Sequence, residues 1–300
     1  MRNNLNAGYG ALLSRQAIAR VTGKVFIVGK AALPYRSQYT ELFTNDNDGT
    51  VRYAATIAGA LTACTASAGD TIYVLPGHTE TVTGAAGILV NVAGVNIIGL
   101  GSGSIRPTIT FTTAVGASMD ITAANVTIEN MLFVCGIDNQ TAMFNVTGAD
   151  VTFNNCEVII SNGTVGAAIG ILTAATATRL KVTNSRFTGP ATNAGTTCAA
   201  CIKHEVGVDY VIKGNYFTGK MTQAILNATT VLRGLIDGNR FVIATGTKAI
   251  AMEASSTPFI SNNYINVPSG TAPVVCAAGF VAGNAYSAAA GVTAGTALTW

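Results

Sequence analysis

The sequence predicts an all-β solenoid, in which the chain coils repeatedly and the strands of successive coils stack. Three observations lead to this prediction: one short pattern recurs eight times, its copies are nearly evenly spaced, and the composition favours strands. Intervals of roughly 20–30 residues, as from Ile128 to Phe153, are typical of one coil of a stacked β-solenoid. Such a fold places equivalent residues in columns, so each column can be examined for residues that could catalyse a reaction or bind a ligand.

The repeated pattern is an apolar residue followed two positions later by Gly or Asn. The apolar residues that begin the copies are Ile97, Ile128, Phe153, Val182, Ile212, Ile236, Ile260 and Val281. From the second copy on, another apolar residue lies five positions later, at Phe133, Val158, Phe187, Phe217, Phe241, Ile265 and Tyr286. We expect both columns to be buried, because each such side chain stabilises the fold by about 1.5–3 kcal/mol.

The composition agrees with a strand-rich chain. Charged residues make up only 10% of the 300 residues and the net charge is +3, which is too apolar for a disordered chain. No apolar stretch resembles a signal peptide or a membrane helix, and the six cysteines show no disulfide framework. We therefore expect synthesis in a host cytoplasm without secretion or membrane association.

The sequence divides into three parts. Residues 1–50 are predicted to be an extended basic arm and linker with one strand at Val25–Val28, since residues 1–36 hold six basic and no acidic side chains. Residues 51–288 are predicted to form the β-helix, with an amphipathic helix at 53–64 that caps its open end. Residues 289–300 are predicted to be a C-terminal tail.

The start of the second part carries a family resemblance. The run from Tyr53 to Glu80, with the strand at 69–74 and the corner at Pro76 and Gly77, resembles the N-terminal entry of pectin-lyase-like right-handed parallel β-helices. The resemblance continues to about Tyr286. It implies a right-handed parallel β-helix but no single function, because the family includes polysaccharide lyases, hydrolases, phage tailspikes and virion proteins without activity.

A polar column lies three positions after the first apolar one. Its last four members are Asn215, Asn239, Asn263 and Asn284. We expect an Asn ladder at a corner, in which each side-chain amide bonds to the next, as an element of architecture. Asn and the preceding Gly214, Gly238 and Gly283 also tolerate the left-handed backbone of a tight corner.

The next column is expected to face solvent. It contains Leu132, Glu157, Arg186, Tyr216, Arg240, Tyr264 and Ala285. We expect an ion pair between Glu157 and Arg186, followed by cation–π contacts between alternating Arg and Tyr. Two interpretations stay open: a ladder that only satisfies itself, or a stripe that binds a partner protein or a glycan. Lys213 and Asp237 are expected to pair one column away.

The acidic residues do not predict a catalytic pair. Glycoside hydrolysis needs two carboxylates held close together, and no two of the fourteen acidic residues share a column in successive coils. The nearest candidates are Glu129 with Glu157 and Asp150 with Asp120. We therefore predict no catalytic residues, and a protein that is not an enzyme.

The few His and Cys residues do not predict a metal site. Cys198, Cys201 and His204 are close in sequence, but strand alternation should put Cys201 and Lys203 on one face and His204 on the other. His78 follows a corner and has no partner in the sequence. We predict no metal and no cofactor.

These expectations favour a structural virion protein of a phage, located in the virion as a capsid decoration, cement or spike subunit. It would bind capsid or other virion proteins through residues 1–36, and the family resemblance implies a homotrimer. No basic cluster interleaved with aromatic residues indicates a nucleic-acid partner. The alternative is a tailspike-like protein that binds or depolymerises polysaccharide along the Arg186–Tyr264 column. A cell-surface adhesin is disfavoured by the lack of a signal peptide.

Overall fold

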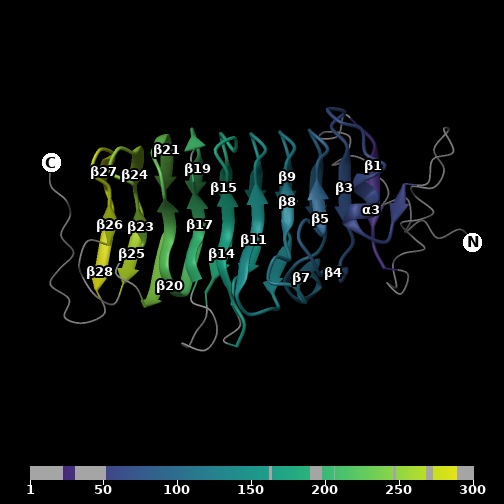
Figure 1. Cartoon of the computed structure of the whole chain (residues 1–300), viewed down its shortest axis with the longest axis horizontal. Helices are drawn as coiled ribbons and strands as arrows, with labels where there is room; N and C mark the ends of the chain where they lie inside the picture. The colour runs from purple at the N-terminus through teal and green to yellow at the C-terminus, as the bar shows by residue number, and fades with distance from the viewer. Residues whose placement is uncertain are drawn as a thin grey trace, which may run out of the picture.

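The protein is a parallel β-solenoid of about nine turns with very little helix (Figure 1). This computed structural model describes residues 23–30, 52–161, 164–189, 198–205, 207–245, 248–267 and 273–288. The prediction of an all-β parallel solenoid is confirmed, and its right-handedness stays a prediction. The expected tail at 289–300 and most of the expected arm lie outside the described residues.

One face of the solenoid, called sheet A, contains the strands that begin each coil. Its strands are β1 (Val25–Val28), β2 (Tyr53–Ala54), β3 (Thr71–Val74), β6 (Asn96–Gly99), β9 (Thr127–Glu129), β12 (Thr152–Asn154), β15 (Lys181–Thr183), β18 (Gly207–Val208), β19 (Val211–Lys213), β21 (Val231–Asp237), β24 (Thr257–Ser261) and β27 (Phe280–Ala282). Each strand pairs in parallel with those of the adjacent coils.

Two further faces, sheets B and C, complete each coil. Sheet B contains β4 (Thr79–Val82), β7 (Thr108–Phe111), β10 (Leu132–Cys135), β13 (Glu157–Ile159), β16 (Arg186–Thr188), β22 (Arg240–Thr245), β25 (Tyr264–Val267) and β28 (Ala285–Ala288). Sheet C contains β5 (Ile88–Val90), β8 (Met119–Ile121), β11 (Gln140–Val146), β14 (Ala167–Thr173), β17 (Cys198–His204), β23 (Ile250–Ala251) and β26 (Val274–Val275). The long strand β20 (Tyr216–Asn227) belongs to both sheets and joins them.

The two predicted apolar columns form the core. Ile128, Phe153 and Val182 are paired in register on sheet A and are fully buried, as the repeat pattern predicts. The column that begins at Phe133 is likewise in register on sheet B. Inside, the rings of Phe187, Phe217 and Phe241 stack with centroids 5.0 and 4.9 Å apart. The core is therefore a continuous stack in which each layer packs on its neighbours.

The N-terminal end differs from the expected arm. Strand β1 lies within sheet A, between β2 and β3, and its Phe26, Ile27 and Val28 are buried. The strand has the predicted bounds, but it belongs to the solenoid, whereas the prediction assigned it to the arm. Its apolar side chains explain this, because they continue the apolar interior column of Ile72 and Val74 by one layer.

The only α-helix among the described residues is α3 (Ile57–Leu61), which is shorter than the helix expected at 53–64. Tyr53 and Ala54 are in strand β2 instead. Thr56 follows the strand and caps the helix, since its Oγ1 accepts a hydrogen bond from Gly59 N at 3.0 Å. Ile57, Ala60 and Leu61 join the core beside β1, β2, β3 and β5. Its role as a cap stays a prediction. A 3₁₀ turn, η1 (Gly103–Ile105), lies farther along.

The tight corner between sheets A and B uses a left-handed residue in most coils. These residues are Asn130, Asn155, Asn184, Gly214, Gly238, Asn262 and Gly283, with φ between 51° and 67°. They come directly before the polar column, so its Asn residues do not have the left-handed backbone that was also expected of them. Asn and Gly are the residue types that adopt this conformation at least cost.

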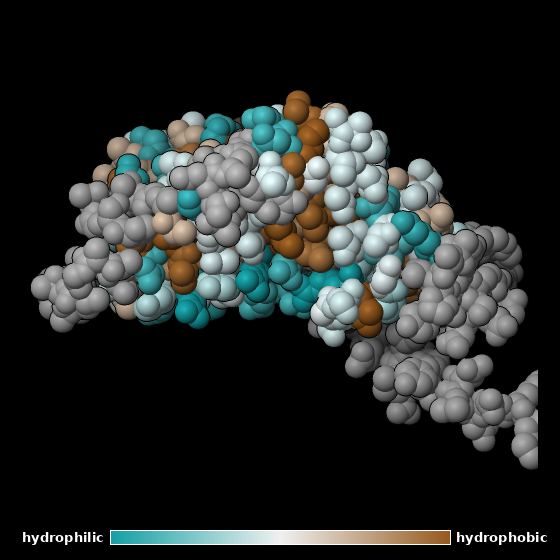
Figure 2. All heavy atoms as spheres, turned by 90° about the horizontal axis from the view of Figure 1, so that it is seen from below, coloured by the Kyte–Doolittle hydropathy of each residue, from teal (hydrophilic) through white to brown (hydrophobic). Residues whose placement is uncertain are grey.

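The surface of the solenoid is weakly charged. Figure 2 shows one face, on which apolar side chains gather in a band across the middle between polar regions. No helix in the described part of the chain is long and apolar enough to cross a membrane.

Candidate functional site

The strongest candidate site is a row of outward-facing side chains on sheet B, which we call the Arg–Tyr stripe, and all but the half-buried Tyr216 are exposed. It consists of Arg186, Tyr216, Arg240 and Tyr264, which occupy equivalent positions on β16, β20, β22 and β25. Alternation along each strand turns the next residue, such as Phe187 or Phe217, into the core. The four stripe residues therefore project outward from four successive coils.

The stripe residues contact one another along the solenoid axis. The Arg186 guanidinium carbon is 5.6 Å from the ring centroid of Tyr216, and that of Arg240 is 5.2 Å from Tyr216 and 5.7 Å from Tyr264. Each such contact contributes roughly 0.5–1 kcal/mol at an exposed site. The predicted alternation of cation–π contacts is confirmed. Among the described residues no ion pair joins either arginine to a carboxylate.

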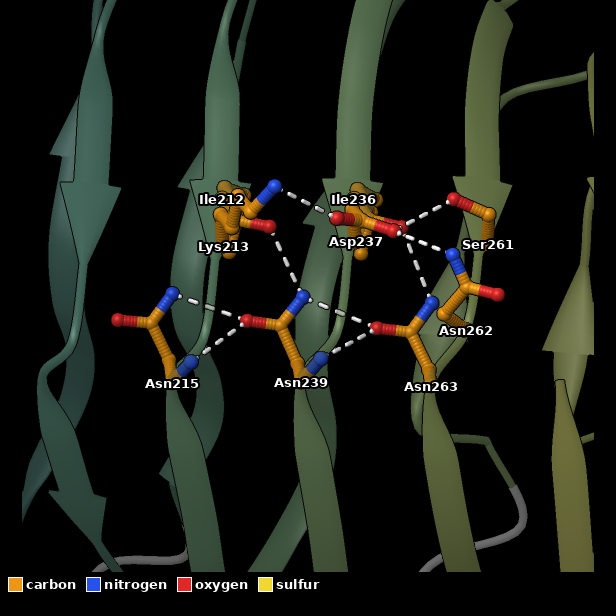
Figure 3. Close-up of polar contacts among 9 residues, drawn as sticks. All are labelled: Ile212, Lys213, Asn215, Ile236, Asp237, Asn239, Ser261, Asn262 and Asn263. Atoms are coloured by element: carbon orange, nitrogen blue, oxygen red, sulfur yellow. Dashed lines mark hydrogen bonds and ion pairs between the residues drawn. The ribbon is translucent and has the colours of Figure 1, made fainter.

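A buried Asn ladder fixes the backbone beside the stripe (Figure 3). Asn239 Oδ1 accepts from both the backbone N and Nδ2 of Asn215, at 2.9 and 3.0 Å, and Asn263 and Asn284 repeat this arrangement. Asn239 Nδ2 also donates to the carbonyl of Ile212 at 2.8 Å. The predicted ladder is confirmed. It immobilises the residue that directly precedes each stripe residue from Tyr216 onward.

A polar network lies on the sheet A side of the same corner. Lys213 Nζ is 3.0 Å from Asp237 Oδ2, as predicted, and Asp237 Oδ1 accepts from Ser261 and Asn262 (Figure 3). The hydrogen bond from Asn262, with those from Ser261 and Lys213, lowers the pKa of the Asp237 carboxyl. This carboxylate is therefore satisfied within the protein.

Glu157 does not pair with Arg186 as expected. The two residues are in register on β13 and β16, but Glu157 Oε2 is 3.6 Å from Arg106 Nη1. Arg106 follows the 3₁₀ turn η1, whose position could not be found from the repeat pattern. The stripe therefore begins at Arg186 with a cation that Glu157 does not neutralise.

The other acidic candidates do not converge. Glu129 lies on sheet A and Glu157 on sheet B, on either side of the corner. Asp120 accepts hydrogen bonds from Ser118 and Asn145, both at 2.8 Å, while Asp150 lies at a corner and pairs with Arg179. These contacts bring neither candidate pair together as two facing carboxylates, and the sequence analysis had predicted no catalytic pair.

The His and Cys candidates are core residues. Cys198, Cys201 and His204 are all fully buried, and among the described residues no group of three or more His, Cys, Asp or Glu side chains could hold a metal ion. The prediction that Cys201 shares a face with Lys203 is wrong, because β17 changes its alternation at Cys201 and Ile202, which are both buried. His78 has a partner that the sequence did not reveal, since its Nε2 is 3.4 Å from Glu80 Oε2.

A second ladder, of alternating charge, was missed by the sequence analysis. Asp150, Arg179, Asp209 and Arg233 occupy one corner, each with a left-handed backbone, and backbone hydrogen bonds connect them in turn through adjacent residues. Arg179 and Arg233 each donate two hydrogen bonds to the preceding Asp, which lowers the pKa of both carboxyls. The intervals between these four positions equal those of the apolar column from Phe153 onward and could have identified them. The charges of the two Arg and the two Asp neutralise one another, so we assign this ladder a structural role.

The comparisons with known proteins give two likenesses to solved structures. No family model matches the chain, and no curated protein matches it. Among solved structures, it is similar to Escherichia coli YbhC, with 14% identity and a TM-score of 0.47, over 80% of this chain and 72% of that one. It is also similar to a rhamnogalacturonan lyase, with 10% identity and a TM-score of 0.48, over 87% of each chain.

The second likeness corrects one prediction. The chain was expected not to be an enzyme, and that prediction is corrected here, since one of the two similar structures is a rhamnogalacturonan lyase. At these identities the likeness concerns the fold alone and assigns no activity to this chain.

Proposed function

We propose that this solenoid is a structural subunit of a phage virion, of the decoration, cement or spike kind, that attaches through its basic N-terminal segment. The observation that supports this is the position of β1. It inserts between β2 and β3 with three buried apolar side chains, so the segment that precedes it is tied to the end of a rigid body.

Contacts on both sides of β1 strengthen this attachment point. Lys24 N donates to Asp70 Oδ1 at 2.6 Å, and Lys30 Nζ donates to Thr79 Oγ1 at 2.6 Å. Residues 1–36 hold Arg2, Arg15, Arg20, Lys24, Lys30 and Arg36 and no acidic residue. A positively charged segment that is anchored in this way suits an acidic shell surface, where electrostatic steering speeds association. A homotrimer on that surface is part of the proposal.

The position of β1 determines which deletion can test attachment through the N-terminal segment. Removing residues 1–36 would also remove β1 and uncover Ile72 and Val74, so loss of binding could reflect damage to the solenoid. Removing residues 1–22 keeps β1. We expect this shorter deletion to leave the circular dichroism spectrum unchanged and to abolish co-sedimentation with shells that lack the subunit. A variant with Arg2, Arg15 and Arg20 changed to Lys is the control and should still bind. Full binding by the deleted protein would refute attachment through this segment.

A second candidate function is polysaccharide binding along the Arg–Tyr stripe. The observation that favours it is the row of outward-facing Tyr rings and guanidinium groups on four successive coils, about 14 Å long if coils are about 4.8 Å apart. Planar groups of this kind bind sugar rings by stacking, and Tyr and Arg dominate binding interfaces. An extended polymer would lie parallel to the solenoid axis.

Affinity measurements with bacterial surface polysaccharides test this second function. We expect Tyr216→Ala and Arg240→Ala to weaken binding at least tenfold, because Tyr216 contacts both arginines. Lys213→Ala, an exposed charge on the neighbouring sheet, is the control and should bind like the wild type. The same incubations, analysed for new reducing or unsaturated ends, test depolymerisation, with Glu129→Gln and Glu157→Gln as the variants. Equal binding by Tyr216→Ala and the wild type would exclude the stripe as the site.

A further inference from the structure

Three sulfur-containing side chains meet in the core at the start of β17, and we call them the sulfur cluster. Cys198 and Cys201 belong to β17, and Met221 lies on β20 in the next coil, directly opposite Cys198 in the register. All three side chains are fully buried. The cluster thus combines a Cys-x-x-Cys spacing on one strand with a thioether from the adjacent coil.

A bend in β17 turns both cysteines toward the interior. Residues three apart on a regular strand point to opposite faces, but here the side chains from Ala200 to Ile202 are buried one after another. Gly170 on the preceding coil gives the bent backbone room, because a Cβ at that position would lie 2.5 Å from the carbonyl oxygen of Cys201. The interruption of the alternation therefore places two thiols on the same side of one strand.

The three sulfur atoms are close enough to share one ion. Cys201 Sγ is 3.5 Å from Met221 Sδ, and the Cys198 and Cys201 thiols are hydrogen-bonded to each other, so Cys201 contacts both other members. Three sulfurs that each lie about 2.3 Å from one metal ion in a plane are about 4 Å apart. The Cys201–Met221 separation is slightly shorter, so the sulfurs need only a small outward movement to surround an ion.

The chemistry of these ligands selects the ion. Thiolate and thioether sulfur are soft ligands of the kind that bind Cu(I). Zn²⁺ is held by Cys, His, Asp or Glu side chains, usually four of them, and Met is not among these ligands. The imidazole of the same strand, His204, contacts Thr173 and Tyr210 instead. We infer that Cys198, Cys201 and Met221 form a binding site for one Cu(I) ion in the core of the solenoid.

Binding at this site exchanges a proton for the ion. One S–H bond breaks, a sulfur–copper bond forms and the proton leaves to solvent, while the oxidation states of sulfur and copper stay the same. One thiolate and one Cu(I) ion are together neutral, so the loaded site adds no net charge to the core. The apolar surroundings also favour Cu(I) over the more highly charged Cu(II), because a hydrophobic shell controls the redox potential of a bound metal.

Copper retention by the full-length protein tests this site. The protein is held for days without oxygen with Cu(I), at a urea concentration below its unfolding transition, where transient opening admits the ion. A Cu(I) chelator then removes loosely bound metal and measures the affinity by competition. We expect about one retained copper per chain, with an X-ray absorption spectrum of sulfur ligands only. Cys201→Ala should weaken binding at least tenfold, and Met221→Leu, which conserves the volume, should weaken it several-fold.

Cys156→Ser is the matched control, with circular dichroism to verify that each variant is folded. Cys156 is also fully buried, and Ser185 takes its place in the column on the next coil, so the variant should bind copper like the wild type. Absence of retained copper in the wild type, equal losses in Cys156→Ser and Cys201→Ala, or nitrogen and oxygen ligands in the spectrum would overturn the inference. Unchanged affinity in Met221→Leu would contradict a site of three sulfurs, and equal retention of Zn²⁺ would contradict the choice of ion.

Discussion

Acidification should destabilise the solenoid through one buried imidazole. His204 is fully buried in the core, where its ring stacks on Tyr210 with centroids 4.5 Å apart. Its Nδ1 is 3.2 Å from Thr173 Oγ1, and its Nε2 has no hydrogen-bond partner. Asn227 Nδ2 donates to Tyr210 Oη, and Tyr210 Oη donates to Met252 Sδ, so Tyr210 is held on its other side by uncharged groups. Burial lowers the pKa of His204 from 6.5 to about 4.

The direction and size of the change in the free energy of unfolding with pH follow from the pKa of His204. Between pH 6.5 and 4 the unfolded chain binds a proton at His204 and the folded chain does not, so the free energy of unfolding falls as the pH falls. A difference of about 2.5 pK units corresponds to about 3.4 kcal/mol once the pH is below both values. From pH 7.5 to pH 5.0 the expected loss is about 2 kcal/mol.

Equilibrium urea unfolding at pH 7.5 and pH 5.0, followed by circular dichroism, measures this loss. His204→Leu removes the titrating group and keeps an apolar side chain in the core. The variant will have its own stability at pH 7.5, so the quantity of interest is the change between the two pH values. That change should be about 2 kcal/mol smaller than in the wild type. His78 is the only other histidine and is present in both proteins, so its contribution cancels.

The carboxyls with lowered pKa values do not interfere in this range. Asp150, Asp209 and Asp237 stabilise the fold above their unfolded pKa near 3.9, and this contribution is lost only as the pH falls below that value. The reasoning fails if His204→Leu and the wild type lose the same stability between pH 7.5 and pH 5.0.

Two further substitutions test the architecture by the same unfolding measurement. Asn239→Ala should cost about 1–3 kcal/mol, because it leaves the buried backbone N of Asn215 without an acceptor. Asn262→Gly removes an exposed amide and keeps a residue type that tolerates the left-handed backbone, so it should cost well under half of that. Equal costs would argue against the ladder. Gly234→Ala should cost about 1–3 kcal/mol or more, since its Cβ would lie 2.1 Å from the Tyr210 ring. Gly84→Ala, with no atom within 4 Å of its Cβ, is the control and should be near neutral, and a stable Gly234→Ala protein would show that this packing is misplaced.

The sequence predicted the columns well because, in a solenoid, residues separated by one coil length in the sequence lie next to each other on adjacent coils. Once Ile128 and Phe153 are aligned, every residue at the same offset is aligned too, and this is why the sequence alone predicts the Asn ladder and the Arg–Tyr stripe. The charge ladder at Asp150 and Arg179 follows the same rule. It was not predicted because its residues lie three positions before the first apolar column and so outside the repeated pattern.

The remaining errors occurred where the chain leaves the repeat. Arg106 reaches Glu157 from a 3₁₀ turn, and its contact depends on the path of that turn rather than on register. The face of Cys201 was misplaced because a bend in β17 interrupts the strict alternation of a flat strand. The strand β1 was recognised, but its pairing with β3 joins segments far apart in the sequence, such as Val25 with Thr71, and is visible only in three dimensions.

The Asn ladder also gives the solenoid a direction. In each link the two donors belong to one residue and the acceptor to its neighbour toward the C-terminus, so every side-chain carbonyl dipole in the row has the same orientation. Because all the links are alike, removal of one complete coil from this stretch would leave the Asn ladder continuous, whereas it would bring two like residues together in the alternating Arg–Tyr stripe. The ladder therefore does not limit the number of coils, and the stripe does.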